Sequence, residues 1–459
     1  MKLKNTYNPL SSSIRKKLRQ ILGKRFLETQ EDLRAYSVDA SPHSFLPEAV
    51  ALPESAEEIA QILRLAQKEK FPVIPRGAGT STTGATLAVK GGLVISLLRL
   101  NRILEINRED LVAVVEPGVF TGDFKRAVEE VGLFYPPDPA SYEFSTIGGN
   151  VACGAGGPKG LKYGTTKDYV LGLEVVTARG EIIFCGRRTM KGVVGYDLVH
   201  LFTGSEGTLG VITKLILKLI PKPPCQATLA LWLEDTEKAA KAFLEILKAK
   251  LFPATAELLD DTTLLAVKRF LEKEILRAQA LLLLEFDGAK KQVEEDLLQA
   301  QKILKNFGLK LEVATSKQER EKLWRARRLI SPALKKIAPG KLADDVVLPR
   351  SKVPEFLSFA KNTGEKYGLT VACFGHLGDG NIHVNILFEK NDEIKAQKVR
   401  VEILNKVLDL CGTISGEHGI GLTKKGFLPK ELSPEVLSLM KGIKQVFDPH
   451  NILNPEKIF

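Results

Sequence analysis

A glycine-rich stretch near the start of the chain, RGAGTSTTG (residues 76–84), limits the fold more than any other feature. The preceding FPVIP has the pattern of a short strand, and the apolar run GGLVISL that follows is also typical of a strand. The Rossmann fingerprint G-x-G-x-x-G needs a helix after its glycines, because the helix N-terminus holds the pyrophosphate. The sequence therefore disfavours a Rossmann domain, and it contains no P-loop motif.

Two more loops repeat the same chemistry, STIGGN (residues 145–150) and TGSEGTLGVIT (residues 203–213). Backbone N–H groups in such a loop can form a nest for a pyrophosphate, helped by hydroxyl groups. One loop of this kind is more often a plain turn, but three in one domain favour a large phosphate-bearing cofactor. Residues 136–168 are also crowded with Gly, Pro, Ser and Thr, and so long an irregular stretch is typical of a ligand-binding surface.

Bulk composition excludes several classes of protein. The 459 residues suffice for two or three domains, and Lys plus Arg exceed Asp plus Glu by 11. The basic residues alternate with acidic ones instead of forming a patch, which argues against nucleic-acid binding and leaves open weak contact with an anionic membrane surface or an acidic protein. Five cysteines at irregular spacing predict neither a disulfide framework nor a zinc or iron–sulfur site.

The same features predict where the protein works. The basic N-terminus lacks an apolar core of signal-peptide length, and no apolar run reaches the roughly 18 residues of a membrane-spanning helix. We therefore expect a cytoplasmic protein, with peripheral contact at the inner face of the membrane left open.

The chain is predicted to have two main domains. Residues 1–44 have the pattern of a helical lead-in, and a Pro-rich stretch near 221–224 marks a boundary. Beyond it, alternating strand and helix patterns suggest an α+β sheet with helices on one face. The last helix and tail are predicted over residues 425–459.

The stretch CFGHLGDGNIHVNIL (residues 373–387) places two of the six histidines on apparently buried strands. A hairpin with Asp379-Gly380 at its tip would pair Leu377 with Ile382 and His376 with His383. Directly opposed residues point to one face of a sheet, about 4.5–5.5 Å apart at Cβ. Two imidazoles so placed can share a metal ion, and Asn385 would lie on the same face.

A third ligand is available in TISGEHGIG, which offers Glu417 followed by His418. Two imidazoles and a carboxylate suit Zn²⁺ or another first-row divalent ion and leave positions open for a substrate. Alternatively, the histidines only hydrogen-bond across the hairpin. A metal-dependent hydrolase could use the same three ligands, but it would leave the glycine-rich loops unexplained.

The motifs PRGAGTSTTG, STIGGNVACGAGG, FTGSEGTLGVIT, GHLGDGNIHVNI, SGEHGIG and DPHNILNP occur in order along nearly the whole chain. Together they resemble the FAD-linked oxidase family with the p-cresol methylhydroxylase (PCMH)-type flavin domain, in the branch of D-lactate dehydrogenases and glycolate oxidase flavoprotein subunits. The resemblance implies an α+β fold: a PCMH or vanillyl-alcohol-oxidase-type FAD-binding domain (45–223), a substrate (cap) domain with the metal site over an antiparallel sheet (224–424), and a tail (425–459) returning to the FAD domain.

The resemblance also implies which residues bind FAD. Arg76 to Ser81 would cradle the pyrophosphate. Some relatives attach the flavin through a histidine at the position of Thr80, so a threonine there implies non-covalent FAD. The implied FAD-lining residues are Pro75, Arg76, Gly77, Ala78, Gly79, Thr80, Ser81, Pro139, Ser145, Thr146, Gly149, Asn150, Gly156, Glu206, Gly210 and Ile212.

The implied reaction is oxidation of a small D-2-hydroxy acid, such as D-lactate or glycolate, to the 2-oxo acid. His376, His383 and Glu417 match the metal ligands, with Zn²⁺ or Mn²⁺ as the ion. His418 would be the general base and Asn385 would orient the substrate.

A substrate carboxylate calls for a guanidinium, which binds it bidentately. In LWRARRLIS, the family's W-x-x-R pattern selects Arg327 over Arg325 and Arg328. Relatives that oxidise 2-hydroxyglutarate carry a lysine where this chain has Ala343, with Lys341 the nearest, which favours a small substrate.

Reduced FAD would pass its electrons to an external acceptor, either an iron–sulfur subunit, an electron-transfer flavoprotein or a respiratory acceptor. The rival readings are a metal-dependent hydrolase, a non-catalytic basic binding module and a flavoprotein with non-redox chemistry.

Overall fold

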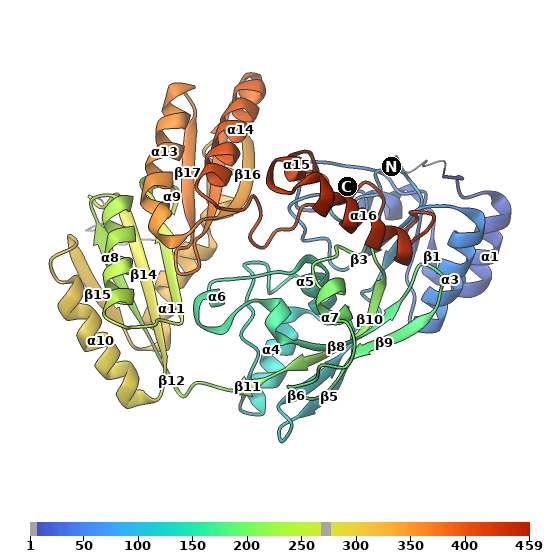
Figure 1. Ribbon diagram of the computed structural model, residues 1–459, viewed down its shortest axis with the longest axis horizontal. Coiled ribbons are helices and arrows are strands. Elements are labelled where there is room, and N and C mark those ends of the chain that lie inside the picture. The colour runs from blue at the N-terminus through green and yellow to red at the C-terminus, as the bar shows by residue number, and fades with distance from the viewer. Residues whose placement is uncertain (1–6, 268–276) are drawn as a thin grey trace. The chain divides into compact units, whose positions relative to one another are not determined.

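The computed structural model describes residues 7–267 and 277–459, so the first six residues of the predicted lead-in lie outside it. The chain divides into two compact units. The first comprises residues 1–155, 165–222 and 417–459, and the second comprises residues 156–164 and 223–416. Figure 1 traces the chain through its helices and strands.

The first unit begins with a four-stranded sheet of order β1-β2-β4-β3. The strands are β1 (Phe26–Leu27), β2 (Ala49–Ala51), β3 (Val73–Arg76) and β4 (Leu93–Ser96). β3 and β4 pair in parallel, and residues 77–92 between them contain no helix. The glycine-rich loop therefore runs from strand to strand, as the sequence predicted, and no helix N-terminus follows it.

A second sheet in the same unit has the order β5-β6-β10-β8-β9, with antiparallel neighbours throughout. Its strands are β5 (Ile103–Asn107), β6 (Val112–Val115), β8 (Val170–Val176), β9 (Ile182–Gly186) and β10 (Val211–Lys218). Two short strands, β7 (Leu133–Phe134) and β11 (Ile220–Pro221), form a separate pair.

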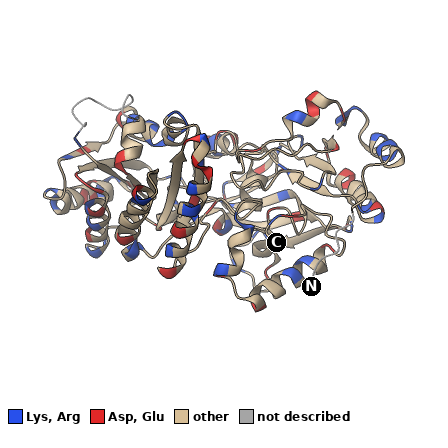
Figure 2. Cartoon of the chain, turned by 90° about the horizontal axis from the view of Figure 1, so that it is seen from above, with Lys and Arg blue, Asp and Glu red and all other residues tan. Residues whose placement is uncertain are grey.

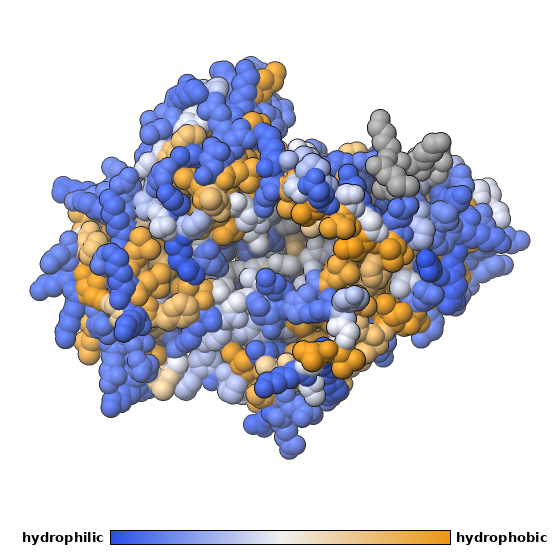
Figure 3. Space-filling model, in the orientation of Figure 1, coloured by the Kyte–Doolittle hydropathy of each residue, from blue (hydrophilic) through white to orange (hydrophobic). Residues whose placement is uncertain are grey.

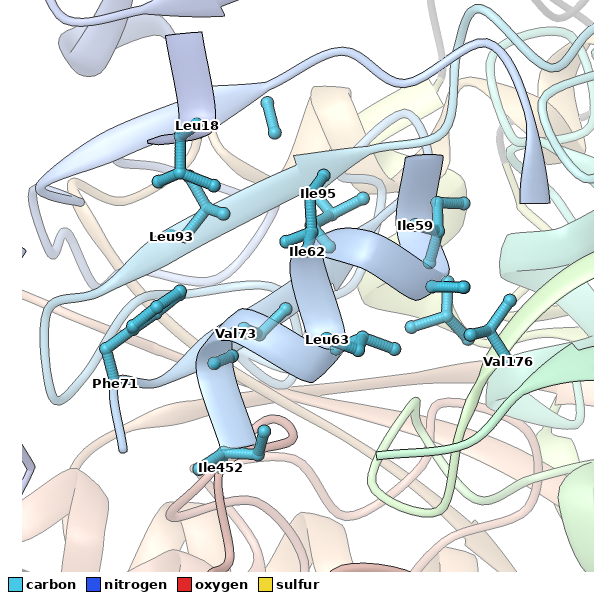
Figure 4. Close-up of a cluster of buried hydrophobic side chains, with 14 of the residues drawn as sticks. Leu18, Ile59, Ile62, Leu63, Phe71, Val73, Leu93, Ile95, Val176 and Ile452 are labelled. Atoms are coloured by element: carbon cyan, nitrogen blue, oxygen red, sulfur yellow. The ribbon is translucent and has the colours of Figure 1, made fainter. Parts of the chain in front are cut away.

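The helices of the first unit are α1 (Ser12–Leu22), α2 (Gln30–Ala35), α3 (Ala56–Glu69), α4 (Thr121–Glu130), α5 (Ile147–Cys153), α7 (Leu198–Phe202), α15 (Leu428–Glu431) and α16 (Pro434–Phe447). Of these, α1 and α3 each bury an apolar face in the main core. Figure 4 shows how Leu18 of α1 and Ile59, Ile62 and Leu63 of α3 pack with Leu93 in the main core.

The C-terminal tail is built into this unit. The N–H of Val73 in β3 donates to the carbonyl of Ile452, and the N–H of Asn454 donates back to the carbonyl of Val73, both over 2.8 Å. Ile452 and Leu453 are fully buried in the same core, and Ile452 is visible in Figure 4. The tail is therefore part of the fold of the first unit.

The second unit is built on a seven-stranded antiparallel sheet of order β15-β12-β14-β13-β17-β18-β16. The strands are β12 (Cys225–Leu233), β13 (Thr255–Leu259), β14 (Ala280–Gly288), β15 (Lys310–Ala314), β16 (Gly340–Val347), β17 (Thr370–His376) and β18 (Asn381–Phe388). The helices are α6 (Gly160–Tyr163), α8 (Thr236–Lys248), α9 (Asp261–Val267), α10 (Lys290–Leu304), α11 (Lys317–Arg328), α12 (Ile330–Leu334), α13 (Val353–Lys366) and α14 (Glu393–Asp409).

One face of this sheet has an apolar part and a polar part. At one end, Phe374 and Leu283 pack with Ala326 of α11, Ile330 of α12 and Leu264 of α9 in a closed apolar cluster. Further along, the residues that point to the same face are polar or charged, because successive side chains on one face of a strand are two residues apart. That polar part carries the candidate site.

The surface bears out the mixed charge pattern. Lys and Arg alternate with Asp and Glu along the helices in the view of Figure 2.

Leu439 and Val446 of α16 are 71% and 69% exposed, and apolar residues gather around that helix in Figure 3. Within the part of the chain that is described, no helix is both long and apolar enough to cross a bilayer.

Candidate active site

The two histidines of the hairpin lie on one face of the sheet, but not in the predicted register. His376 pairs with Asn381, and His383 pairs with Phe374. The predicted pairing of His376 with His383, and of Leu377 with Ile382, is therefore wrong, because the turn centres on Gly378-Asp379 instead of Asp379-Gly380. A shift of two residues keeps every side chain on its face, so the histidines become diagonal neighbours with ring centroids 5.1 Å apart.

Glu417 completes a set of three ligand atoms. One nitrogen from each histidine and one carboxylate oxygen of Glu417 all lie within 4.8 Å of one another. Glu417 directly follows Gly416, whose N–H donates to Asp345 Oδ2 over 2.8 Å. Asp345 in turn pairs with His383 across β16 and β18. The Asp345 carboxylate therefore holds the chain immediately before this glutamate.

Unsatisfied polar atoms surround the histidines. Asn381 and Asn385 are 5% and 2% exposed, and they alternate with His383 on the same face of β18. The Asn385 side-chain nitrogen and both polar side-chain atoms of Asn381 have no hydrogen-bond partner among the described residues. Buried polar atoms are normally paired, so this pattern fits a site that holds a ligand. Two imidazoles and a carboxylate fit a first-row divalent ion.

Arg327 is the arginine of α11 that enters this face. Its side chain is buried, whereas Arg325 and Arg328 are exposed. The Arg327 Nε donates to Glu257, and the guanidinium carbon lies 4.8 Å from the centre of the Phe374 ring. The helix thus presents to the site the arginine that the W-x-x-R pattern selects.

Glu257 is a functional candidate that the sequence analysis missed. It lies directly opposite His376 on β13 and is fully buried. Its carboxylate accepts hydrogen bonds from His376 Nδ1 and Arg327 Nε. Burial alone would raise the pKa of Glu257, but the charge of Arg327 and the hydrogen bonds from His376 and Arg327 outweigh it and lower the pKa to about 2. The only sequence signal was one acid inside the apolar strand TAELL.

His418 lies in a loop held by contacts within the first unit. Thr83 Oγ1 donates to the His418 carbonyl over 3.2 Å, and the Glu206 carboxylate accepts the N–H groups of Ile420 and Gly421 over 2.7 and 2.8 Å. Burial raises the pKa of Glu206 to about 6, against the opposing effect of these two bonds. The imidazole Nε2 of His418 lies 3.9 Å from Glu417 Oε1, which brings the predicted base beside a predicted ligand.

The three glycine-rich loops meet in the first unit. A Cβ added to Gly77 would lie 2.3 Å from Thr146 Oγ1, and one added to Gly207 would lie 3.2 Å from Pro75 Cγ. Gly79 has a φ of +74°, a conformation that favours glycine. The loops therefore approach each other through bare backbone, which fits a cradle for a phosphate-bearing cofactor.

The other FAD-lining candidates are placed as follows. Ser145 and Asn150 are buried and joined through the Thr121 hydroxyl, with bonds of 3.1 and 2.8 Å. Arg76 turns inward, where its guanidinium donates to the Val38 carbonyl and to Thr86 Oγ1. Ala78, Thr80 and Ser81 lie in the first loop, and Gly149 lies in α5. Gly210 directly precedes β10, Ile212 is its second residue, and Pro139 lies in the irregular stretch. Gly156 belongs to the segment 156–164 of the second unit.

Comparison with known proteins identifies the chain as a flavin-dependent oxidoreductase. A model of the FAD binding domain matches residues 47–186, and a model of the C-terminal domain of FAD linked oxidases matches residues 222–458. The chain belongs to the FAD-linked oxidase family. Membership of this family removes the support for the hydrolase and basic binding-module readings.

Curated relatives cover nearly the full length. The chain is 41% identical to glycolate oxidase subunit GlcD of Bacillus subtilis, covering 98% of this chain and 97% of that one. It is 35% identical to a D-lactate dehydrogenase of Anaerostipes hadrus, with 98% of each chain covered. It is 33% identical to a D-2-hydroxyglutarate dehydrogenase of Stutzerimonas stutzeri, covering 95% and 96%.

Solved structures agree on the fold. Substrate-bound p-cresol methylhydroxylase superposes with a TM-score of 0.80 at 19% identity, covering 97% of this chain and 96% of that one. An alkyldihydroxyacetonephosphate synthase gives 0.79 at 20% identity, covering 100% and 87%. The predicted PCMH-type architecture is confirmed.

Proposed function

We propose that this protein oxidises a small D-2-hydroxy acid, D-lactate or glycolate, to the corresponding 2-oxo acid. The observation that carries the proposal is the set of His376, His383 and Glu417, whose ligand atoms lie within 4.8 Å of one another. A buried arginine joins this set through Glu257. Full-length similarity to proteins named for glycolate and D-lactate supports the same substrate class.

When bound, FAD would supply the acceptor for hydride. A bound divalent ion, Zn²⁺ or Mn²⁺, would draw negative charge from the substrate oxygens. The protein positions the reactants. Arg327 holds the substrate carboxylate through its terminal nitrogens, and Asn385 donates to a substrate oxygen through its side-chain nitrogen. His418 takes the hydroxyl proton at Nε2, since an imidazole is well matched to proton transfer near neutral pH. FAD is held without a covalent bond, because Thr80 offers no nucleophilic nitrogen.

The size of the substrate follows from the strand beside Asn385. Ala343 is directly opposite Asn385, so a methyl group stands where a longer side chain would reach towards a second carboxylate. Lys341 lies two residues before Ala343 on β16, and its ammonium group donates to Ser331 Oγ over 3.0 Å. This arrangement favours a substrate with one carboxylate. D-2-hydroxyglutarate is the alternative, favoured by Lys341 on the same face and by the relative of that name.

The electrons from reduced FAD pass to an external acceptor. None of the five cysteines forms a disulfide, and their irregular spacing in the sequence does not match the ligand pattern of an iron–sulfur cluster. We propose a protein acceptor, either an iron–sulfur subunit, an electron-transfer flavoprotein or a respiratory component. Action in the cytoplasm, at the inner face of the membrane, would suit such an exchange. The formal net charge of +11 favours docking to an acidic partner or an anionic surface.

The test is anaerobic bleaching of the flavin. The purified protein should be yellow, and its absorbance near 450 nm should fall when D-lactate or glycolate is added. L-lactate should bleach it far more slowly, and D-2-hydroxyglutarate serves as the test of the alternative. A colourless protein, or a flavin that no 2-hydroxy acid reduces, would refute the proposal.

Two variants separate the proposed roles. His418→Ala should keep the flavin and the metal but lose rapid bleaching, because it removes only the base. His376→Ala should keep the flavin but lose the metal as well. Equal metal content in both variants would contradict the assignment of His376 as a ligand.

A further inference from the structure

Glu257 shares its carboxylate between two residues with different proposed tasks. One oxygen, Oε1, contacts His376 Nδ1, and the other, Oε2, accepts the hydrogen bond from Arg327 Nε. Direct pairing of Glu257 with His376 across β13 and β17 fixes the first contact. The side chain is fully buried, so solvent does not compete for either oxygen.

The contact with His376 determines which ring nitrogen is available for a metal. An ionised carboxylate only accepts hydrogen bonds, so His376 Nδ1 must carry the proton that it shares with Glu257. The lone pair is then on Nε2, which is the nitrogen that can coordinate an ion. A carboxylate that orients a ligating histidine in this way commonly affects metal affinity by about 10–100-fold.

The contact with Arg327 determines how the guanidinium is presented. Arginine offers five N–H donors in a planar fork. When Nε is bonded to Glu257, the two terminal nitrogens are left to form a bidentate pair with a second carboxylate. The Phe374 ring, 4.8 Å from the guanidinium carbon, limits rotation of the fork about its axis.

We infer that Glu257 is a positioning residue that couples metal binding to recognition of the substrate carboxylate. It holds His376 in the tautomer that binds the ion and turns the Arg327 fork towards the substrate. This inference rests on the proposed function, because it takes His376 as a ligand and Arg327 as the anion-binding group.

The substitution Glu257→Gln tests this sharing, because an amide offers one acceptor where the carboxylate offers two. If the amide oxygen faces Arg327, its NH₂ group faces His376 Nδ1 and forces the proton onto Nε2. If the oxygen faces His376, the NH₂ group opposes the N–H of Arg327. Neither orientation satisfies both donors, so at least one task fails.

The matched control is Glu285→Gln. Glu285 is a second buried glutamate on the same face of the sheet, and its carboxylate accepts from three side chains, Trp324 Nε1 over 3.1 Å, Lys159 Nζ over 3.3 Å and Thr228 Oγ1 over 3.5 Å. It touches neither a proposed ligand nor Arg327 in these contacts. The control therefore reports the general cost of a buried amide at this sheet.

The experiment measures metal affinity apart from turnover. Each flavin-loaded protein is stripped with a chelator, and Zn²⁺ binding is then titrated against a competing fluorescent chelator, while 450 nm absorbance reports retained FAD. We expect Glu257→Gln to weaken Zn²⁺ binding by about 10–100-fold and Glu285→Gln to leave it within about twofold. Glu257→Asp should lie between Gln and the natural residue, because it keeps two acceptors on a shorter side chain.

A third variant, Arg327→Met, separates the two tasks. It should raise KM for the hydroxy acid while leaving Zn²⁺ affinity near that of the unchanged protein. Equal Zn²⁺ affinity in Glu257→Gln and Glu285→Gln, or an equal loss in Arg327→Met, would overturn the inference. If the unchanged protein binds no metal at all, the proposed function fails instead, so the two failures are distinguishable.

Discussion

Replacing Gly77 by alanine should weaken FAD binding more than it weakens the fold. The added Cβ would lie 2.3 Å from Thr146 Oγ1, with Thr146 Cβ at 3.6 Å and Gly149 Cα at 3.8 Å. Only the hydroxyl oxygen is in conflict, so the loops that carry these residues must separate by roughly 1 Å to restore a normal contact. The backbone φ of Gly77 is not positive, so strain of the main chain adds little.

The magnitude follows from the cost of inserting one methyl group into a packed site. Overpacking of this kind costs about 1–3 kcal/mol. Since about 1.4 kcal/mol corresponds to a tenfold change in affinity, the dissociation constant for FAD should rise by roughly 5–150-fold. The thermal unfolding of the FAD-free protein should change less, because separated loops then no longer need to fit a ligand.

A double-mutant cycle tests whether the cost of Gly77→Ala comes from the Thr146 hydroxyl. Thr146→Ala removes the clashing hydroxyl along with the cap that it provides to the Gly149 N–H over 3.2 Å. The loss of this cap costs about 1 kcal/mol by itself. In the Thr146→Ala background, Gly77→Ala should then cost little, because the nearest atom to the new methyl is at an ordinary distance.

The assay is titration of the apoprotein with FAD, followed by flavin fluorescence. The control is Gly442→Ala in α16, where an added Cβ meets nothing within 4 Å, so FAD affinity should not change. The reasoning is refuted if Gly77→Ala binds FAD as tightly as the unchanged protein, or if its penalty persists in full in the Thr146→Ala background.

Three further predictions concern pH, a buried ion pair and the metal. Burial raises the pKa of Asp260 to about 7, so its contribution to the free energy of unfolding is fully present below its ordinary pKa and is lost as pH rises through about 7. Relative to the Asp260→Asn variant, the free energy of unfolding measured in urea should therefore fall by about 1.4 kcal/mol per pH unit between pH 4 and 7. Parallel pH profiles for the two proteins would contradict this. Arg400→Met should destabilise the second unit by about 3–5 kcal/mol because it leaves buried Asp344 without its two-bond partner, whereas Lys406→Met, at a surface pair, should change the denaturation midpoint little. Chelation should abolish bleaching by D-lactate without releasing FAD, and added Zn²⁺ or Mn²⁺ should restore it; bleaching that survives complete removal of metal would exclude the proposed role of the ion.

The face carrying the histidines could be predicted from the sequence although the pairing could not. The period of a strand is two residues, so His383 and Asn385 share a face in any register. The turn geometry decides the pairing, and GDGN permits more than one placement of its tip. The predicted pairing of His376 was wrong by two residues, which leaves its side chain on the same face of the sheet. A pairing wrong by one residue would have placed the histidines on opposite faces.

Glu257 could not be predicted in the same way. It is separated from His376 by 119 residues and from Arg327 by 70, and no local pattern links them. A single glutamate in a buried strand has a strong physical reason to find a cationic or hydrogen-bonding partner, because an unpaired buried charge is very costly. The strand pairing of β13 with β17 decides which partner it finds.

The loop with His418 connects two proposed tasks, because one motif would both line the FAD site and hold the loop that carries the proposed base. From the sequence, TGSEGTLGVIT was predicted to serve FAD alone, yet the Glu206 carboxylate of that motif accepts the N–H groups of Ile420 and Gly421. The Asn454 side chain donates to the Glu206 carbonyl over 2.7 Å, so the C-terminal tail secures the same motif. His418 is therefore placed by contacts inside the first unit, beside the loops proposed to hold the flavin. A substitution at Glu206 should for this reason slow proton abstraction as well as loosen FAD.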